Sequence, residues 1–173
     1  MGGNPDFPKA ARETGAELHA VARGGIGARL VDLARERSYA DGAVRIAPSV
    51  RDRFPDLTLP FLSPPEGGPD APYLCVAAAR LAVAETGSVL ISEPAGPANP
   101  DLAETCVCLV RGSDVVPSLD DAIAFLEREA VERTLPGDPA LVTGPSRTGD
   151  IEQVMAIGVH GPKSLVVLLV EDA

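Results

Sequence analysis

The apolar run at residues 165–170, LVVLLV, constrains the fold more than any other stretch of the chain. A strand with one face in water alternates apolar and polar residues, whereas this run presents no polar face. Strands of this kind are covered on both faces, as in parallel or mixed sheets packed between other layers. The run therefore predicts an α/β fold: a three-layer, Rossmann-like domain with a mostly parallel sheet.

Strand and helix patterns alternate along the rest of the chain. Strands are expected at residues 17–22, 43–47, 88–92 and 105–110. Helices are expected at residues 26–37, 75–83 and 119–133, with Ser118 as the N-cap of the last one. Six prolines between residues 55 and 72 make that segment irregular. The pattern indicates a single domain over residues 1–173, and we expect the extreme N-terminal segment, roughly the first 15 residues, to be flexible.

Composition and charge exclude several classes of protein. A hydrophobic fraction of 45% and a charged fraction of 23% are typical of a soluble globular domain. No apolar run is long enough to span a membrane, and the N-terminus lacks the pattern of a signal peptide. The net charge of -10, with scattered basic residues, argues against a nucleic-acid partner. An odd number of cysteines, 3, argues against a disulfide framework, so we expect a reduced, cytoplasmic protein.

The loop GPSRTGD, residues 144–150, gathers hydroxyls, an arginine and an acid just before an expected short helix. Thr148 suits the N-cap of that helix, and Asp150 in its first turn favours the helix dipole. These roles leave Ser146 and Arg147 unexplained. In a ligand site, Arg147 would hold an anionic group while Asp150 bonds a hydroxyl. A ligand site and a structural loop both remain open.

Two further polar groups could serve such a site. Glu85 precedes Thr86 and Gly87, and a carboxylate at a glycine turn can act as a base, a nucleophile or a hydrogen-bond acceptor. Alternatively, Glu85 accepts backbone N–H bonds and holds the turn. His160, in a turn after the expected last helix, could titrate near neutral pH in a cleft or cap that helix.

Dinucleotide and metal sites are disfavoured. The glycines at residues 24–27 follow a strand, but the third small residue of the dinucleotide fingerprint is replaced by Leu30. Cys106 and Cys108 share one face of a strand, yet only Cys75 remains to complete a set, and iron–sulfur clusters usually need four thiolates. We expect buried cysteines, and no metal or iron–sulfur cluster in this chain.

Two segments, AVAETGSVLIS at residues 82–92 and GPSRTGDIEQVMAIGVHGPKSLVVLLVE at residues 144–171, resemble the LUD-domain family of the lactate utilization protein C type. Between them, residues 115–122 are similar to the strand-to-helix junction of that family. The resemblance covers the C-terminal part of the chain in detail and the N-terminal part in outline.

The resemblance implies a fold similar to the CoA-transferase and ribose-5-phosphate-isomerase superfamily. It also implies an accessory component of bacterial L-lactate, or 2-hydroxy-acid, utilisation that acts with iron–sulfur oxidoreductase partners and binds a small anionic ligand. The superfamily uses a carboxylate beside a glycine turn, which makes Glu85 the candidate catalytic residue. The candidate ligand-binding residues are Thr86, Gly87, Gly144, Ser146, Arg147, Thr148, Asp150 and His160.

The chain departs from the family pattern within residues 94–105. Family members often carry Leu-Leu-Pro-Pro and a histidine before the strand at residues 105–110, where this chain has Asp-Leu-Ala-Glu-Thr. Substrate and partner therefore stay open. One alternative is a stand-alone enzyme of the CoA-transferase or sugar-phosphate-isomerase type that uses Glu85, and another is a ligand-sensing or structural subunit.

Overall fold

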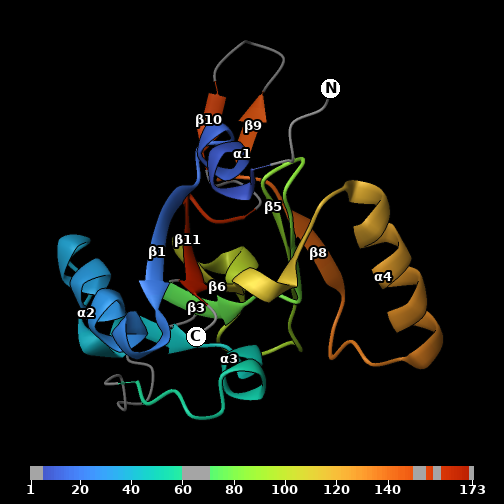
Figure 1. The fold of residues 1–173 in the computed structure, drawn as a ribbon. Helices are drawn as coiled ribbons and strands as arrows, with labels where there is room; N and C mark the ends of the chain where they lie inside the picture. The colour runs from blue at the N-terminus through green and yellow to red at the C-terminus, as the bar shows by residue number, and fades with distance from the viewer. Residues whose placement is uncertain (1–5, 60–70, 150–154, 158–160, 172–173) are drawn as a thin grey trace.

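A computed structural model describes residues 6–59, 71–149, 155–157 and 161–171 of the protein. Two main sheets, the helices that cover them and a separate two-stranded hairpin make up its architecture (Figure 1). The helices are α1 (Phe7–Glu13), α2 (Ile26–Glu36), α3 (Pro48–Arg53) and α4 (Leu119–Glu132), with 3-10 turns η1 (Arg23–Gly25), η2 (Asp41–Ala43), η3 (Pro100–Leu102) and η4 (Gly112–Asp114). Part of the N-terminal segment that was expected to be flexible thus forms helix α1, whose Phe7 and Ala11 are buried.

The central sheet has five strands in the order β1-β11-β6-β3-β2, and every neighbouring pair is parallel. These strands are β1 (Glu17–Ala22), β2 (Val44–Ile46), β3 (Leu74–Ala78), β6 (Thr105–Arg111) and β11 (Ser164–Glu171). The predicted α/β class and the mostly parallel sheet are confirmed. The run LVVLLV lies in β11, between β1 and β6, where both strand edges are paired.

The second sheet has the order β7-β4-β5-β8. Its strands are β4 (Leu81–Val83), β5 (Ser88–Ser92), β7 (Val115–Val116) and β8 (Pro139–Val142). β5 runs antiparallel to β4 and β8, while β7 pairs with β4 in parallel. A separate hairpin pairs β9 (Arg147–Gly149) with β10 (Met155–Ile157).

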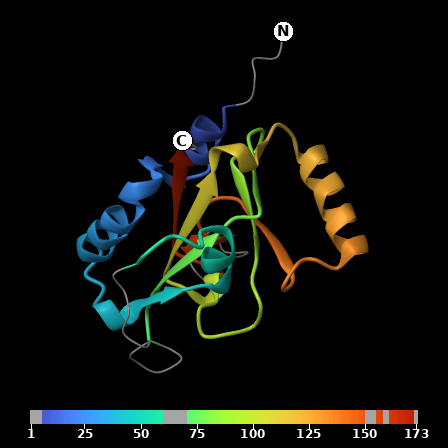
Figure 2. The same cartoon turned by 60° about the horizontal axis from the view of Figure 1, so that its bottom comes forward.

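Side chains of β6 show how the layers pack. Val107 and Leu109 point into a core shared with α2 and α3, whereas Cys106 and Cys108 point into a core shared with the second sheet. α4 covers the outer face of the second sheet, so α2 and α4 lie on opposite sides of the molecule (Figures 1 and 2). One face of the central sheet therefore carries the expected helical layer, and the other carries a second sheet with α4 outside it.

Two elements differ from the sequence-based prediction. The helix expected at residues 75–83 is wrong, because this stretch forms β3 and β4. Every residue of both strands is buried, so pairing in the two sheets outweighs the helix propensity of alanine. The short helix expected after the 144–150 loop is also contradicted. Thr148 pairs with Ala156 in the β9–β10 hairpin, and it therefore cannot be a helix N-cap.

The parallel strands give the molecule two distinct edges. α1, the β4–β5 turn and the β9–β10 hairpin lie toward the amino edge of the central sheet, while α3 lies toward its carboxyl edge (Figure 1). Within the described part of the chain, none of the helices has the length and hydropathy to cross a membrane.

Candidate functional site

The loop after β8 is fixed against two other segments at the amino edge. Gly144 has φ +70, and a Cβ at this position would lie 2.3 Å from the backbone oxygen of Thr14 at the end of α1. Ser146 donates its backbone N–H to the carbonyl oxygen of Pro162 at 2.9 Å. The backbone of the predicted loop is therefore held between α1 and the turn that precedes β11.

This loop borders a cleft of about 400 Å³. Gly144 and Ser146, two residues of the predicted site, line it together with Thr14, Thr143 and Asp101. Hydroxyl groups, backbone groups and one carboxylate are suited to binding a small polar molecule, and Asp101 can accept a hydrogen bond from a ligand hydroxyl. Sequence reasoning did not select Asp101, although it lies in the segment that departs from the family pattern.

A chain of hydroxyl groups connects the β4–β5 turn to this cleft. Thr86 Oγ1 and Ser88 Oγ share a hydrogen bond of 2.7 Å, and Ser88 Oγ and Thr143 Oγ1 share another of 2.6 Å. Ser88 is buried, while Thr143 lines the cleft. The structure thus joins Thr86 to the 144–146 loop, two parts of the predicted site that are far apart in the sequence.

Glu85 lies beside the start of α4. Its side chain is exposed, and its Oε2 accepts a hydrogen bond of 3.0 Å from the backbone N–H of Leu119. Its own N–H donates to the carbonyl oxygen of Pro117 at 3.0 Å. This geometry matches the alternative in which the carboxylate holds the turn and binds the free N–H groups of a helix start. A catalytic role for Glu85 stays a prediction.

Gly87 brings this turn against α1. Its φ is +69, and a Cβ there would lie 2.4 Å from the backbone of Ala10. Gly87 and Gly144 therefore both allow close approach to the same helix, which gives them a structural role independent of any ligand.

The remaining predicted site residues cannot be placed as side chains. Arg147 and Thr148 belong to β9 by their backbone pairing. Asp150 and His160 lie outside the described residues. Their assignment to a ligand site stays a prediction.

A second cleft, of about 370 Å³, adjoins the first through Asp101. Glu93, Asn99 and Asp138 also line it. Burial raises the pKa of Glu93, while a hydrogen bond of 3.3 Å from the backbone N–H of Ser49 to its Oε2 opposes that rise. No motif in the sequence pointed to Glu93.

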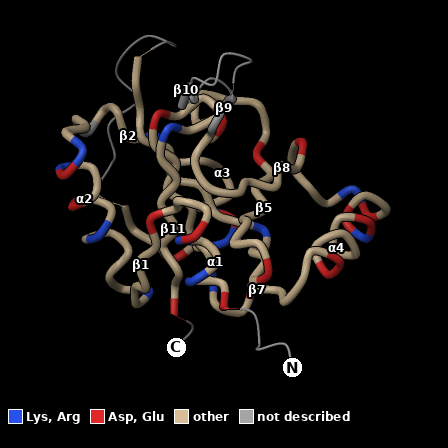
Figure 3. The backbone as a smooth tube through the Cα atoms, turned by 90° about the horizontal axis from the view of Figure 1, so that it is seen from above, with Lys and Arg blue, Asp and Glu red and all other residues tan. Residues whose placement is uncertain are grey.

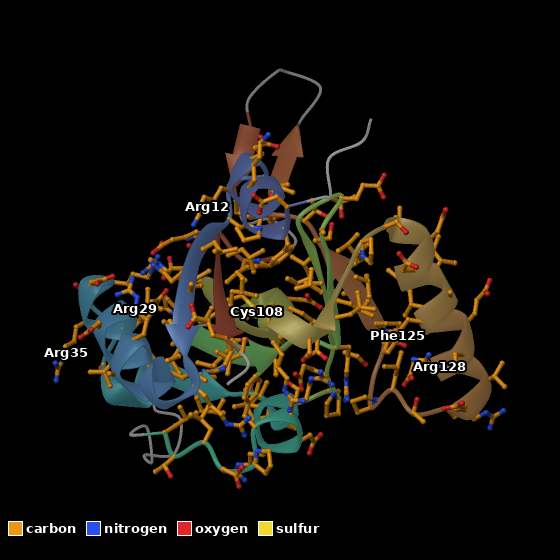
Figure 4. The ribbon with its side chains drawn as sticks, viewed as in Figure 1. Arg12, Arg29, Arg35, Cys108, Phe125 and Arg128 are labelled. Carbon is orange, nitrogen blue, oxygen red and sulfur yellow. The ribbon has the colours of Figure 1, made fainter. Side chains whose placement is uncertain are left out.

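The three cysteines lie in the core. Cys75 and Cys106 are register partners on β3 and β6, and Cys108 follows on the same face of β6, in the interior (Figure 4). Burial raises the pKa of all three thiols, that of Cys106 to about 12. Protonated thiols are poor metal ligands and nucleophiles. Among the described residues, no group of three or more His, Cys, Asp or Glu side chains could hold a metal ion.

Known proteins resemble this chain in sequence. The family model of the LUD domain matches residues 74–170. Lactate utilization protein C of Bacillus licheniformis is 32% identical over 96 residues, which cover 54% of this chain and 40% of that protein. Lactate utilization protein C of Geobacillus kaustophilus is 33% identical over 101 residues, covering 56% of this chain and 42% of that protein. The match thus spans only about two-fifths of the length of these relatives.

A solved structure shares the fold. The crystal structure of a DUF162 family protein from Deinococcus radiodurans superposes with a TM-score of 0.64 at 16% sequence identity, covering 95% of this chain and 93% of that one. This likeness extends the shared architecture beyond residues 74–170 to nearly the whole chain. The family match itself takes in more than half of the sequence, and the chain therefore belongs to the LUD domain family.

Proposed function

We propose that the protein takes part in bacterial L-lactate utilisation, beside iron–sulfur oxidoreductase partners, and binds a small anionic ligand at the loop of residues 144–150. The observation that carries this proposal is the match to proteins named Lactate utilization protein C, from Bacillus and Geobacillus species. The matched family region, residues 74–170, includes both the β4–β5 turn and the loop.

The geometry of the cleft supports a ligand at the loop. Ser146, Thr143 and Thr14 offer hydroxyl groups, and Asp101 offers an acceptor for the hydroxyl of a 2-hydroxy acid. Arg147 directly follows Ser146 and would bind the carboxylate of such a ligand with its planar guanidinium group. The cleft volume of about 400 Å³ accommodates a molecule of this size.

Partner proteins are needed because oxidation of lactate to pyruvate releases two electrons and two protons, and an acceptor must take these up. The chain has 3 cysteines, fewer than the four thiolates of a usual iron–sulfur cluster, and all three are buried. The electron carriers would therefore belong to partner proteins. This chain would bind the organic acid or hold the assembly together.

Deletion of the gene in its own host tests the role in lactate metabolism. We expect the deletion strain to grow poorly with L-lactate as the sole carbon source, to grow normally on glucose, and to recover when the wild-type gene is restored. Equal growth of the deletion and parent strains on L-lactate would refute this role.

A thermal-shift titration with L-lactate and pyruvate tests the loop. A ligand at a hundred times its dissociation constant stabilises the folded state by about 2.7 kcal/mol, which raises Tm by several degrees. We expect the shift in the wild type to be lost in Arg147→Ala and kept in Arg35→Ala, an exposed arginine on α2 that points away from the molecule (Figure 4). Equal shifts in both variants would assign the ligand to another site.

A further inference from the structure

Arginines gather at the carboxyl edge of the central sheet, opposite the loop of the proposed ligand site. Ala78, the last residue of β3, pairs with Leu109 of β6. Arg111 ends β6 two residues later, and Arg80 follows the end of β3 by two residues, where the chain turns toward the second sheet. Arg53 ends α3, which packs on β3 and begins directly after β2. In open α/β sheets, the crevice beyond the carboxyl ends of the strands is where ligands commonly bind.

These arginines carry polar atoms that nothing satisfies within the described part of the chain. Buried side-chain atoms without a hydrogen-bond partner there include the Nε atoms of Arg53, Arg80 and Arg111 and the Oε1 atom of Glu93. Buried polar groups are nearly always hydrogen-bonded, because an unpaired one has lost its hydrogen bonds to water without replacement. A cluster of such atoms at one place indicates a position where a further polar group binds.

Each residue of the cluster is held in place by its neighbours. Ser49 at the start of α3 accepts the N–H of Ala78 on its Oγ at 2.8 Å and donates its own N–H to Glu93. The guanidinium of Arg111 stacks on the ring of Phe54, 5.0 Å from its centroid. The backbone N–H of Arg80 donates to the carbonyl oxygen of Leu90 at 2.7 Å, where the chain passes from one sheet to the other.

Within the described part of the chain, some arginines at this edge form ion pairs with acidic side chains, whereas Arg80 and Arg111 form none. Arg53 forms an ion pair with Asp114, and Arg23, which also stacks on Phe54, pairs with Asp56. Glu171 ends β11, one residue beyond Val170, the register partner of Arg111. Asp52 of α3 and Glu93, just after β5, are the other acids near the cluster. Among the described residues, neither Arg80 nor Arg111 forms an ion pair with any of these carboxylates, although the charge of Arg80 is close enough to oppose the rise in the pKa of Glu93.

Two partly buried guanidinium groups that form no ion pair among the described residues are unusual in a protein of net charge -10. A charge that is removed from water without a partner destabilises the fold, so its presence calls for a compensating anion. Elsewhere, acidic and basic residues are interspersed along the exposed faces of α2 and α4 (Figure 3).

We propose that the carboxyl edge of β3 and β6 binds a small anion that carries a carboxylate or phosphate group, with Arg80 and Arg111 as its ligands. The planar guanidinium groups bind either oxyanion through paired N–H donors. The ion pair with Asp114 fixes Arg53 beside them, and Glu93 Oε1 accepts a hydrogen bond from a hydroxyl or protonated oxygen of the same ligand. Its arginines lie at the opposite edge of the central sheet from the 144–146 loop, although Glu93 also lines the second cleft, which adjoins the loop cleft through Asp101.

Isothermal titration calorimetry with inorganic phosphate, pyrophosphate, malonate and L-lactate tests the site and separates the two oxyanion classes. The variant is the double substitution Arg80→Gln with Arg111→Gln. Its matched control is Arg35→Gln, the same chemical change at an exposed arginine of α2. Arg147→Ala tests whether a probe binds instead at the loop of residues 144–150, at the amino edge of the sheet. A lysine pair, Arg80→Lys with Arg111→Lys, keeps the charge but loses the paired donors.

We expect at least one phosphate or carboxylate probe to bind the wild type. The double glutamine variant should weaken that binding by about tenfold or more, because hydrogen bonds between charged groups contribute about 1.5–3 kcal/mol each. Arg35→Gln and Arg147→Ala should leave it unchanged, the lysine pair should give an intermediate affinity, and added salt should weaken it.

Thermal unfolding of the double glutamine variant without ligand shows whether weaker binding results from misfolding. Removing two unpaired charges should leave Tm unchanged or raise it. If the double glutamine variant does not fold, the affinity of the lysine pair, compared with that of the wild type, is used instead. The proposal is overturned if no probe binds the wild type. It is also overturned if the double glutamine variant and the lysine pair both bind the probe as tightly as the wild type does. Binding that only Arg147→Ala abolishes would overturn it as well while supporting the ligand at the loop.

Discussion

At the scale of single residues, the candidate site depends on two glycines that face the same helix. Gly87 and Gly144 both adopt positive φ, and a Cβ at either position would clash with the backbone of α1 or of Thr14, which follows its last residue. A glycine at such a position is required by backbone geometry, whatever the loop binds. The same loop can therefore serve as both a structural contact and a ligand site.

Replacement of Gly144 by alanine should destabilise the protein by about 1–3 kcal/mol, because the strained backbone and the close approach to Thr14 O at 2.3 Å both oppose a Cβ. Urea unfolding measures the change. Gly24→Ala is the control, since nothing lies within 4 Å of a Cβ at Gly24. Equal stabilities of the two variants would contradict the packing of the loop on α1.

Glu85→Gln separates the two roles considered for this residue. Glutamine keeps an oxygen that can accept the N–H of Leu119, so the thermal stability should stay within about 0.5 kcal/mol of the wild type. A carboxylate that acts as a nucleophile or base would be lost, and turnover with it. We expect the variant to support normal growth on L-lactate. Failure of lactate-dependent growth by a fully folded variant would favour the stand-alone enzyme.

At the scale of elements, α4 shows a start signal that the sequence reveals completely. Ser118 Oγ accepts the N–H of Asp121 at 3.3 Å, and Asp121 Oδ2 accepts the N–H of Ser118 at 3.0 Å, which is a reciprocal capping box. Both groups lie within the segment that starts the helix, so local sequence suffices to predict it. The first residue of α4, Leu119, also donates its backbone N–H to the Glu85 carboxylate.

Ser118→Ala should therefore lower the free energy of unfolding by about 1 kcal/mol, because the N-terminal N–H groups of α4 lose their acceptor. Ser118→Thr keeps a hydroxyl and should recover most of that loss. Denaturation curves of the three proteins provide the measurement. A wild-type value for Ser118→Ala would mean that α4 adds little to global stability.

The elements that sequence reasoning missed depend on distant pairing. Alanines in residues 76–79 favour a helix locally, yet this stretch lies in the middle of the central sheet between β2 and β6. Thr148 has the properties of an N-cap, yet it pairs with Ala156. Glu93 and Asp101 reach the clefts only through tertiary packing, so no local pattern identifies them. β11 was predictable from its continuous apolar run, and α2 and α4 from apolar residues at helical spacing, because these patterns are local to each element.

At the scale of the whole molecule, the interior contains ionisable groups that it keeps neutral. Burial raises the pKa of Cys75, Cys106, Cys108 and Tyr73 between the two sheets, and that of Tyr39 beside the core shared with α2 and α3. Each group holds its proton more tightly in the folded state than in the unfolded chain. Its contribution to stability is therefore complete below the ordinary pKa and declines as pH rises toward the folded value.

The free energy of unfolding should consequently fall as pH rises above about 9, the range where cysteines of the unfolded chain ionise. Each group that ionises only in the unfolded chain contributes a slope of about 1.4 kcal/mol per pH unit. Cys106→Ala removes one such group and should reduce the slope by that amount. Unfolding curves between neutral and strongly alkaline pH measure both slopes. A flat profile would contradict a protonated core.

We propose that this LUD domain protein supports oxidation of L-lactate through partners that carry the electrons. Reconstitution in cell extract tests it most directly. Extract of the deletion strain receives purified protein, and pyruvate formed from L-lactate is measured with an added electron acceptor. We predict little pyruvate without the protein and recovery toward the parent rate with it. Equal pyruvate formation with and without the protein would contradict the account.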